Sequence, residues 1–209
     1  MTDFEPFLRS TEIIDWSHPA VRARSTELAA GSPSQMDTAK RCFEFVRDHI
    51  QHSSDFRRNP VTCSASEALS HGTGYCYAKS HLLAALLRAR KIPAGFCYQR
   101  LSIHDNGAPY SLHGLNAVYL AEFDWYRIDA RGNKLGVDAQ FRPPVEQLAF
   151  HIMFPDEECN FPDILPDPLP VVVNALRSHS TWDAMLANLP DWPFPSLAGA
   201  VTPIEPTPE

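Results

Sequence analysis

Among the five cysteines of this 209-residue chain, Cys76 has the surroundings that best suit a nucleophile. It follows the segment Gly-Thr-Gly-Tyr and opens a predicted Leu-rich helix. The N-terminus of a helix carries unpaired N–H groups and the positive end of the helix dipole, and both favour the thiolate, which is the nucleophilic form of cysteine. The N–H group of Cys76 could also donate to an oxyanion at an attacked carbonyl. On local sequence alone, a buried structural thiol remains an equal alternative.

A nucleophilic thiol needs a base, and the base needs a partner that orients it. His113 begins a predicted strand and Asp129 ends the next one, so both could face Cys76. The register between the two strands decides whether they meet. A hairpin turning about Phe123 would leave Asp129 four residues out of register with His113, about 13 Å at ~3.3 Å per residue. A hydrogen bond between them therefore requires an earlier turn, near Ala121, or a bulge.

Several other polar residues are weaker candidates. Gln51 and His52, at the end of a predicted helix, could add a second donor to an oxyanion hole or could simply cap the helix. Lys79, one turn after Cys76, could hold an anionic substrate or lie in solvent. Four residues that flank the expected cleft are candidates for substrate binding: Asn116, Arg131, Asn133 and Lys134.

No metal site is expected. Cys63, His71 and Cys76 do not have the spacing of a structural zinc site and lack a fourth ligand. The thiol chemistry needs neither a metal nor an organic cofactor, so none is predicted. The five cysteines are widely spaced and include no Cys-x-x-Cys pair, which indicates free thiols, with Cys42 on the apolar face of a helix.

The predicted elements place helices before strands. Ser64 and Glu67 have the spacing of a capping box for a short helix that ends at Gly72. Apolar periodicity predicts longer helices over residues 21–30, 34–51 and 75–91. Alternation predicts strands over residues 95–103, 112–121, 125–130 and 147–154. Helices followed by antiparallel strands indicate an α+β domain.

Composition and charge exclude several classes of protein. With 44% hydrophobic residues the chain can bury a core. The longest apolar run, Leu82–Leu87, is far short of the ~20 residues of a membrane span. The first twenty residues lack the features of a signal peptide, so a cytoplasmic protein is expected. A net charge of −7 without a dense basic patch argues against binding to nucleic acid or to an anionic membrane.

The C-terminal quarter differs from the rest. Most of the 19 prolines lie after residue 142, and the chain from residue 151 onward has nine acidic residues and one arginine, a balance of −8. We predict a compact domain over residues 1–155 and an acidic, proline-rich extension over residues 156–209. Short helices are expected over 171–178 and 181–189, followed by a flexible tail from Pro190. The extension could fold across the domain as a lid.

Three ordered motifs resemble those of the transglutaminase-like superfamily. The first joins Gly74-Tyr75-Cys76, an apolar helix ending in Arg88-Ala89, and Ile92-Pro93-Ala94. The second is His113 with Val-Tyr-Leu beginning five residues later, and the third is Trp125 with Asp129 four residues later. The resemblance covers about residues 36–135. It implies a papain-like fold in which a helix that begins at the nucleophile packs on an antiparallel sheet. It also implies a triad, with Cys76 as nucleophile, His113 as base and then acid, and Asp129 as the orienting group.

Departures from the family pattern affect substrate recognition more than the triad. Leu115 stands where the family often has Trp, and Ala130 and Arg131 follow the aspartate where Pro is frequent. Small bacterial-type members are the closest models. They imply a thiol enzyme that acts on amide bonds of peptides or proteins through an acyl-thioester, by hydrolysis or acyl transfer. The alternative is a non-catalytic module of the same fold that binds a peptide or protein. Oligomeric state stays open.

Overall fold

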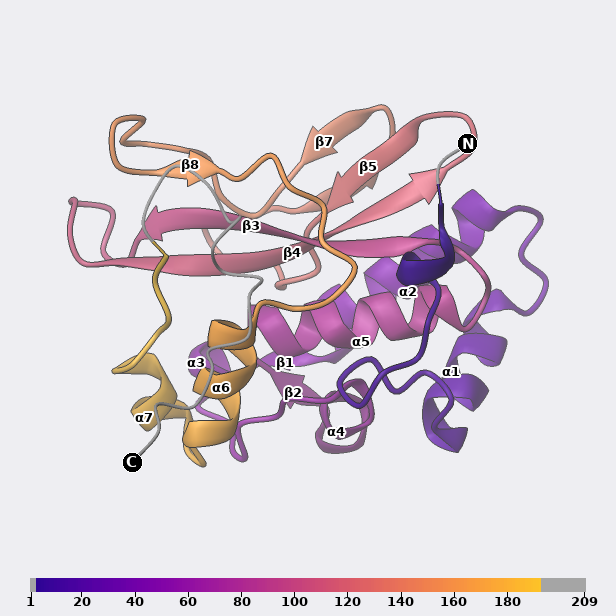
Figure 1. The fold of residues 1–209 in the computed structure, drawn as a ribbon, viewed down its shortest axis with the longest axis horizontal. Coiled ribbons are helices and arrows are strands. Elements are labelled where there is room, and N and C mark those ends of the chain that lie inside the picture. The colour runs from indigo at the N-terminus through magenta and orange to yellow at the C-terminus, as the bar shows by residue number, and fades with distance from the viewer. Residues whose placement is uncertain (1–2, 193–209) are drawn as a thin grey trace.

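The fold is a layer of helices packed against one face of an antiparallel sheet (Figure 1). The computed structural model describes residues 3–192, and within them no helix is both long and apolar enough to cross a membrane. The main sheet has the strand order β5-β4-β3-β8, and the short strands form two further pairs, β1-β2 and β6-β7. The strands are β1 (Gln51–His52), β2 (Thr73–Gly74), β3 (Ala94–Ser102), β4 (Tyr110–Leu120), β5 (Asp124–Ile128), β6 (Gln140–Arg142), β7 (Val145–Gln147) and β8 (Cys159–Asn160). The helices are the 3-10 turn η1 (Glu5–Phe7), α1 (Pro19–Ala29), α2 (Gln35–His49), α3 (Ser53–Phe56), α4 (Ala65–His71), α5 (Cys76–Arg88), α6 (Pro170–Ser178) and α7 (Trp182–Leu186).

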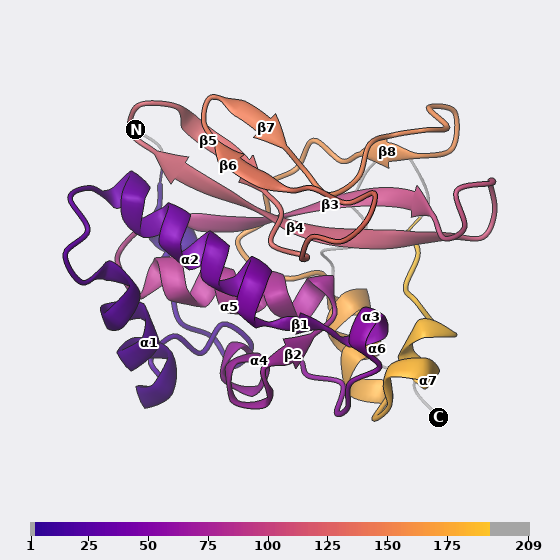
Figure 2. The same cartoon turned by 180° about the vertical axis from the view of Figure 1, so that it is seen from behind.

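Helix α5 lies at the centre, with the sheet on one side and α1, α2 and α4 around the rest (Figures 1 and 2). All of its residues are buried, although the sequence predicts a single apolar stripe. The difference arises because α5 is covered on every side. At its end, the buried guanidinium of Arg88 donates to the carbonyls of Arg9, Ala94 and Pro166, and so ties the start of β3 and two distant segments to this helix.

Helices α2 and α4 are both capped, and the predicted capping box of α4 is confirmed. The Ser34 hydroxyl accepts the N–H of Asp37 at 3.0 Å where α2 begins. Ser64 and Glu67 form the capping box of α4, and Gly72 ends that helix with a φ of +62°. The two helices lead into β1 and β2, which pair in parallel. The capped ends therefore bring residues 51–52 beside the segment that enters α5.

The strand predicted over residues 147–154 is wrong. Strand β7 stops at Gln147, and β8 pairs with the edge of β3 instead. The reason is that carboxylates accept the backbone N–H groups of this stretch. Glu158 accepts those of Met153 and Phe154, and Asp129 accepts that of Ala149. With these donors satisfied, the segment runs as a loop between β7 and β8.

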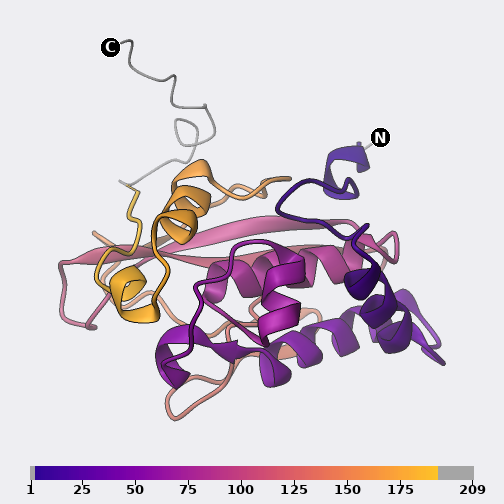
Figure 3. The same ribbon diagram turned by 90° about the horizontal axis from the view of Figure 1, so that it is seen from below.

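The two predicted C-terminal helices are present as α6 and α7, at the end of α5 opposite α1 (Figure 3). Helix α7 is shorter than predicted, and Thr181 stands at its N-cap position. Both helices contribute to the core that surrounds α5, through the buried residues Leu169, Val172, Leu176 and Met185. The domain boundary near residue 155 stays a prediction.

The predicted tail begins with two anchored residues. The carbonyl of Pro190 accepts the N–H of Leu112 in β4 at 2.8 Å. Both carboxylate oxygens of Asp191 accept hydrogen bonds from Arg100 in β3, at 2.8 and 2.7 Å. The remainder of the predicted flexible tail, residues 193–209, lies outside the described residues.

Candidate active site

A pocket of about 520 Å³ opens where the N-terminal end of α5 meets β4. Its walls come from α3, the end of β3, the loop between β7 and β8, and α7. Cys76 and His113 both line it, with 7% and 5% of their surfaces exposed. The predicted nucleophile and the predicted base therefore share one cavity, of a size usual for ligand sites.

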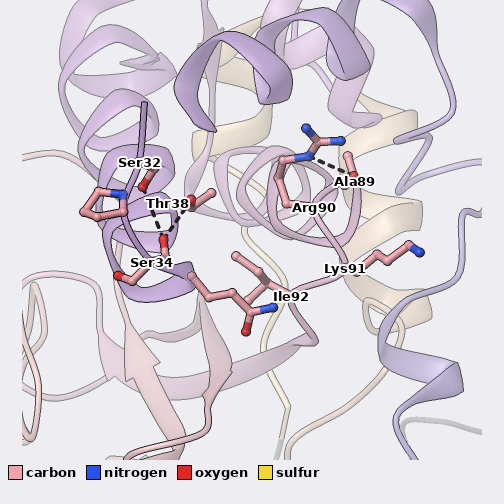
Figure 4. Close-up of a pocket in the computed structure, with 9 residues that line it drawn as sticks. Ser32, Ser34, Thr38, Ala89, Arg90, Lys91 and Ile92 are labelled. Atoms are coloured by element: carbon pink, nitrogen blue, oxygen red, sulfur yellow. Dashed lines mark hydrogen bonds between the residues drawn. The ribbon is translucent and has the colours of Figure 1, made fainter. Parts of the chain in front are cut away.

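A second hollow, of about 460 Å³, lies at the opposite end of α5 (Figure 4). Its walls are the start of α2, around Ser34 and Thr38, and the turn after α5, with Arg90 and Lys91. The groups there include hydroxyls, basic side chains and aliphatic chains, whereas the predicted nucleophile and base, Cys76 and His113, line the first pocket. We therefore place the candidate chemistry at the first pocket.

Cys76 is the first residue of α5. Within residues 3–192 no side chain caps this helix end, so its first N–H groups are available to a negative charge. Gly74 lets the entering chain pass close to the helix, since a Cβ there would lie 3.0 Å from Cβ of Ala78 and 3.2 Å from Oγ1 of Thr62. The glycine-rich approach identified in the sequence thus serves close packing ahead of the nucleophile.

His113 and Asp129 form a buried hydrogen-bonded pair. Nε2 of His113 lies 2.8 Å from Oδ2 of Asp129. The same carboxylate accepts the N–H groups of Arg131 at 3.1 Å and Ala149 at 3.0 Å. Burial opposes ionisation of Asp129, but the charge of His113 and these hydrogen bonds lower its pKa. Asp129 is therefore a fixed carboxylate that receives the Nε2–H of the imidazole.

The Cys76 thiol interacts with the same imidazole. Burial alone would lower the pKa of His113, but the charges of Asp129 and Cys76, and hydrogen bonds with both, raise it to about 10. Because Nε2 is bound to Asp129, Nδ1 is the nitrogen left for the sulfur. Phe150 packs its ring against His113 edge to face, with centroids 4.9 Å apart, and limits rotation of the imidazole.

The register that joins His113 to Asp129 differs from both sequence alternatives. Leu120 pairs with Asp124, so the turn centres on Glu122, between the two predicted positions. Strand β5 then ends at Ile128, opposite Asn116. Asp129 follows directly and is a diagonal neighbour of His113, a relation that long side chains can bridge. The pair forms without the bulge that the sequence analysis offered as one solution.

The structure distinguishes the two oxyanion candidates that follow α2, Gln51 and His52. Among residues 3–192, His52 lines the pocket and Gln51 does not. The His52 ring packs edge to face against Tyr75, the residue before Cys76, with centroids 5.4 Å apart. Burial and the nearby Arg131 hold the pKa of His52 well below its usual range, so its ring is neutral. Its Nδ1 lies 3.1 Å from the Ser54 hydroxyl.

Two other candidates have structural contacts. Lys79 is neither solvated nor in the pocket: it is 1% exposed and donates to the carbonyls of Arg47 and Ile50 at the end of α2. Burial lowers its pKa to about 7. Asn116 is buried and donates to the carbonyls of Ser80 and Gly95, each at 3.1 Å, which joins α5 to β3. Its expected contact with substrate is therefore not supported by its position.

Arg131 and Lys134 do line the pocket, bound to an acid that the sequence analysis did not single out. Arg131 makes two hydrogen bonds to Asp55, at 2.5 and 3.0 Å, and Lys134 approaches the same carboxylate at 2.9 Å. Asn133 instead holds the following turn, since its side chain accepts the N–H of Ala139 at 2.8 Å. Asp55 lies 76 residues before Arg131, so no local pattern could have paired them.

All five cysteines are free thiols, as predicted. Burial raises the pKa values of Cys42 and Cys97 to about 12 and that of Cys63 to about 11. Cys42 is fully buried, in agreement with its place on the apolar face of α2. Among residues 3–192, no cluster of three or more side chains is arranged to hold a metal ion.

The candidate site lies in the part of the chain that matches the model of a known protein family. The model for the transglutaminase-like superfamily matches residues 22–130, just over half of the chain, and spans Cys76, His113 and Asp129. A search of curated proteins finds no match.

Solved structures match this chain at low identity. A candidate cysteine protease from Cytophaga hutchinsonii matches with a TM-score of 0.51 and 19% identity, over 63% of this chain and 43% of that one. The periplasmic domain of TgpA from Pseudomonas aeruginosa matches with a TM-score of 0.41 and 19% identity, over 54% of this chain and 42% of that one. The chain spans less than half the length of the solved proteins it matches.

Proposed function

The chain belongs to the transglutaminase-like superfamily, and we propose that it is a thiol enzyme that attacks amide bonds of peptides or proteins through Cys76. One observation carries the proposal: the imidazole of His113 is held by Asp129 and interacts with a thiol at the N-terminus of α5, inside a pocket. This arrangement contains a nucleophile, a proton carrier and an orienting carboxylate.

The proposed reaction has two halves. The sulfur of Cys76 attacks the amide carbon, and the carbonyl oxygen becomes an oxyanion. His113 gives its Nδ1 proton to the departing amine as the C–N bond breaks, which leaves an acyl-thioester. Water or an amine then gives a proton to His113 as it attacks the thioester carbon, and the C–S bond breaks, which returns the Cys76 thiolate beside a protonated His113. Hydrolysis and acyl transfer differ only in this acceptor.

We further propose that His52 donates to the oxyanion, together with the N–H of Cys76. If the Ser54 hydroxyl donates to Nδ1 of His52, Nε2 of this neutral ring carries the hydrogen.

Replacing His52 by Ala is expected to lower kcat by about 100-fold, the usual effect of removing one such donor. Gln51→Ala, at the adjacent position of β1, should change kcat less than threefold. Steady-state kinetics on a peptide amide compares the two, and equal effects would contradict the assignment.

Selective labelling tests the thiol chemistry directly. The parent chain is treated with iodoacetamide at pH 6.5, and the modified cysteines are quantified by mass spectrometry. Cys76 is expected to react at least ~10-fold faster than any other cysteine, because only a thiolate reacts appreciably. The matched competitor is Cys159, which is partly exposed and whose pKa is raised. If Cys159 reacts as fast as Cys76, the non-catalytic binding module becomes the better description.

A further inference from the structure

One wall of the active-site pocket is apolar and is completed by the C-terminal segment. Leu186 of α7 and Leu189 line the pocket together with Leu101, Leu112 and Met153. Polar residues line the pocket as well, among them Arg131 and Lys134, which are both bound to Asp55. We infer that the apolar wall is a subsite for a large apolar side chain of the substrate. The inference rests on the proposed function and names its substrate class.

The segment from α7 to Asp191 is anchored at both ends beside the triad. At one end, the hydroxyl of Tyr75 donates to the carbonyl of Trp182, and the N–H of Trp182 donates to Asn59 at 2.7 Å. At the other end, the carbonyl of Pro190 accepts the N–H of Leu112. Tyr75 directly precedes Cys76, and Leu112 directly precedes His113. The segment therefore runs along the pocket from the neighbour of one reacting residue to the neighbour of the other. Figure 1 shows its path from α7 to the end of the sheet.

This segment forms a wall and leaves the pocket open. The 520 Å³ cavity is present with Leu186 and Leu189 in place. Two of the wall residues are large apolar side chains that remain in contact with water, Leu186 with 40% and Met153 with 58% of its surface exposed. Exposed apolar surface that is continuous with a pocket marks a binding site, because a ligand of like polarity would remove it from water.

The position of the apolar wall indicates which molecule binds there. It lies in the same cavity as Cys76 and His113, so a group bound there is part of the molecule whose amide is attacked. An extended peptide that presents a leucine-like side chain to this wall fits both requirements. An acidic side chain does not, because contact with apolar side chains would cost the carboxylate its hydration.

Peptide binding to the full-length Cys76→Ala variant tests the subsite without any chemistry. Dye-labelled tetraglycine amides carry a single leucine at each position in turn, and fluorescence anisotropy gives Kd. At one position, leucine is expected to tighten binding by about tenfold over glycine, and glutamate at that position is expected to give no gain. Leu186→Ser should remove the gain from leucine and leave the affinity for tetraglycine within twofold. Met153→Ser, in the loop between β7 and β8, should do the same.

Phe123→Ser is the matched control, because Phe123 is 37% exposed but lies at the β4–β5 turn. It should keep the preference for leucine. Equal affinities for leucine and glycine at every position, or a leucine preference that survives both Leu186→Ser and Met153→Ser, would overturn the subsite. Because the binding assay uses a chain without the nucleophile, failure here leaves the thiol enzyme intact. Failure of selective labelling would reject the enzyme and leave the binding result standing.

Discussion

Replacing Cys76 by Ala is expected to abolish turnover of peptide amides, with a fall of about 10⁴-fold or more in kcat/KM. The reason is that the sulfur forms the bond to the acyl group, and no neighbouring side chain of the pocket replaces it in that role. Amine release from a fluorogenic peptide amide measures the loss. Cys159→Ala is the matched control, since Cys159 is a partly exposed thiol of β8, and it should keep full activity.

Two results would contradict this expectation. A Cys76→Ala variant with more than a few per cent of parent activity would show that another group is the nucleophile. A parent that releases no amine from any peptide amide, yet binds peptides, would favour the binding module. Thermal unfolding of the variant separates both results from misfolding, because the thiol is small and its replacement by Ala leaves a cavity of only one atom.

The sequence predicts the elements of this fold better than their pairing. Caps and helical periodicity are local, and so α2, α4 and α5 follow from residues within one or two turns. The failed strand over residues 147–154 has the alternation of a strand, but its N–H groups go to Asp129 and Glu158. Carboxylates outside the stretch, Asp129 20 residues before Ala149 and Glu158 five residues after Met153, thus overrode its alternating pattern.

In the candidate site, too, the sequence predicts what depends on local motifs and misses what depends on long-range pairing. Cys76, His113 and Asp129 are identified from ordered motifs, whereas the register that joins the last two depends on a turn centred on Glu122. Lys79 has the polarity of a surface residue, yet it is buried because it caps the end of α2. The apolar wall escapes prediction because its members come from three elements and two loops, and Leu186 and Leu189 lie in a segment that the sequence assigns to an extension.

The carboxylate of Asp129 has a role that an amide of the same shape cannot fill. It accepts the Nε2–H of His113, which leaves Nδ1 for the sulfur. Its charge also opposes the effect of burial and raises the pKa of His113. In Asp129→Asn, an amide NH₂ turned toward Nε2 would force the hydrogen onto Nδ1, where the ring can no longer accept a proton from the thiol. We expect kcat to fall by about 10⁴-fold, as for other triads with this change.

The pH profile distinguishes this positioning role from a merely structural one. Because activity needs the protonated imidazole beside the thiolate, the parent's kcat/KM is expected to fall as the pH rises through about 10, the pKa of His113. Removing the negative charge of Asp129 lowers that pKa, so the residual activity of Asp129→Asn should decline at a lower pH. Glu146→Gln removes a carboxylate that pairs with Arg127 on β5 and should change neither kcat nor the profile. An Asp129→Asn variant that is folded, retains kcat within tenfold and keeps the alkaline limb near pH 10 would show that the imidazole does not depend on this carboxylate.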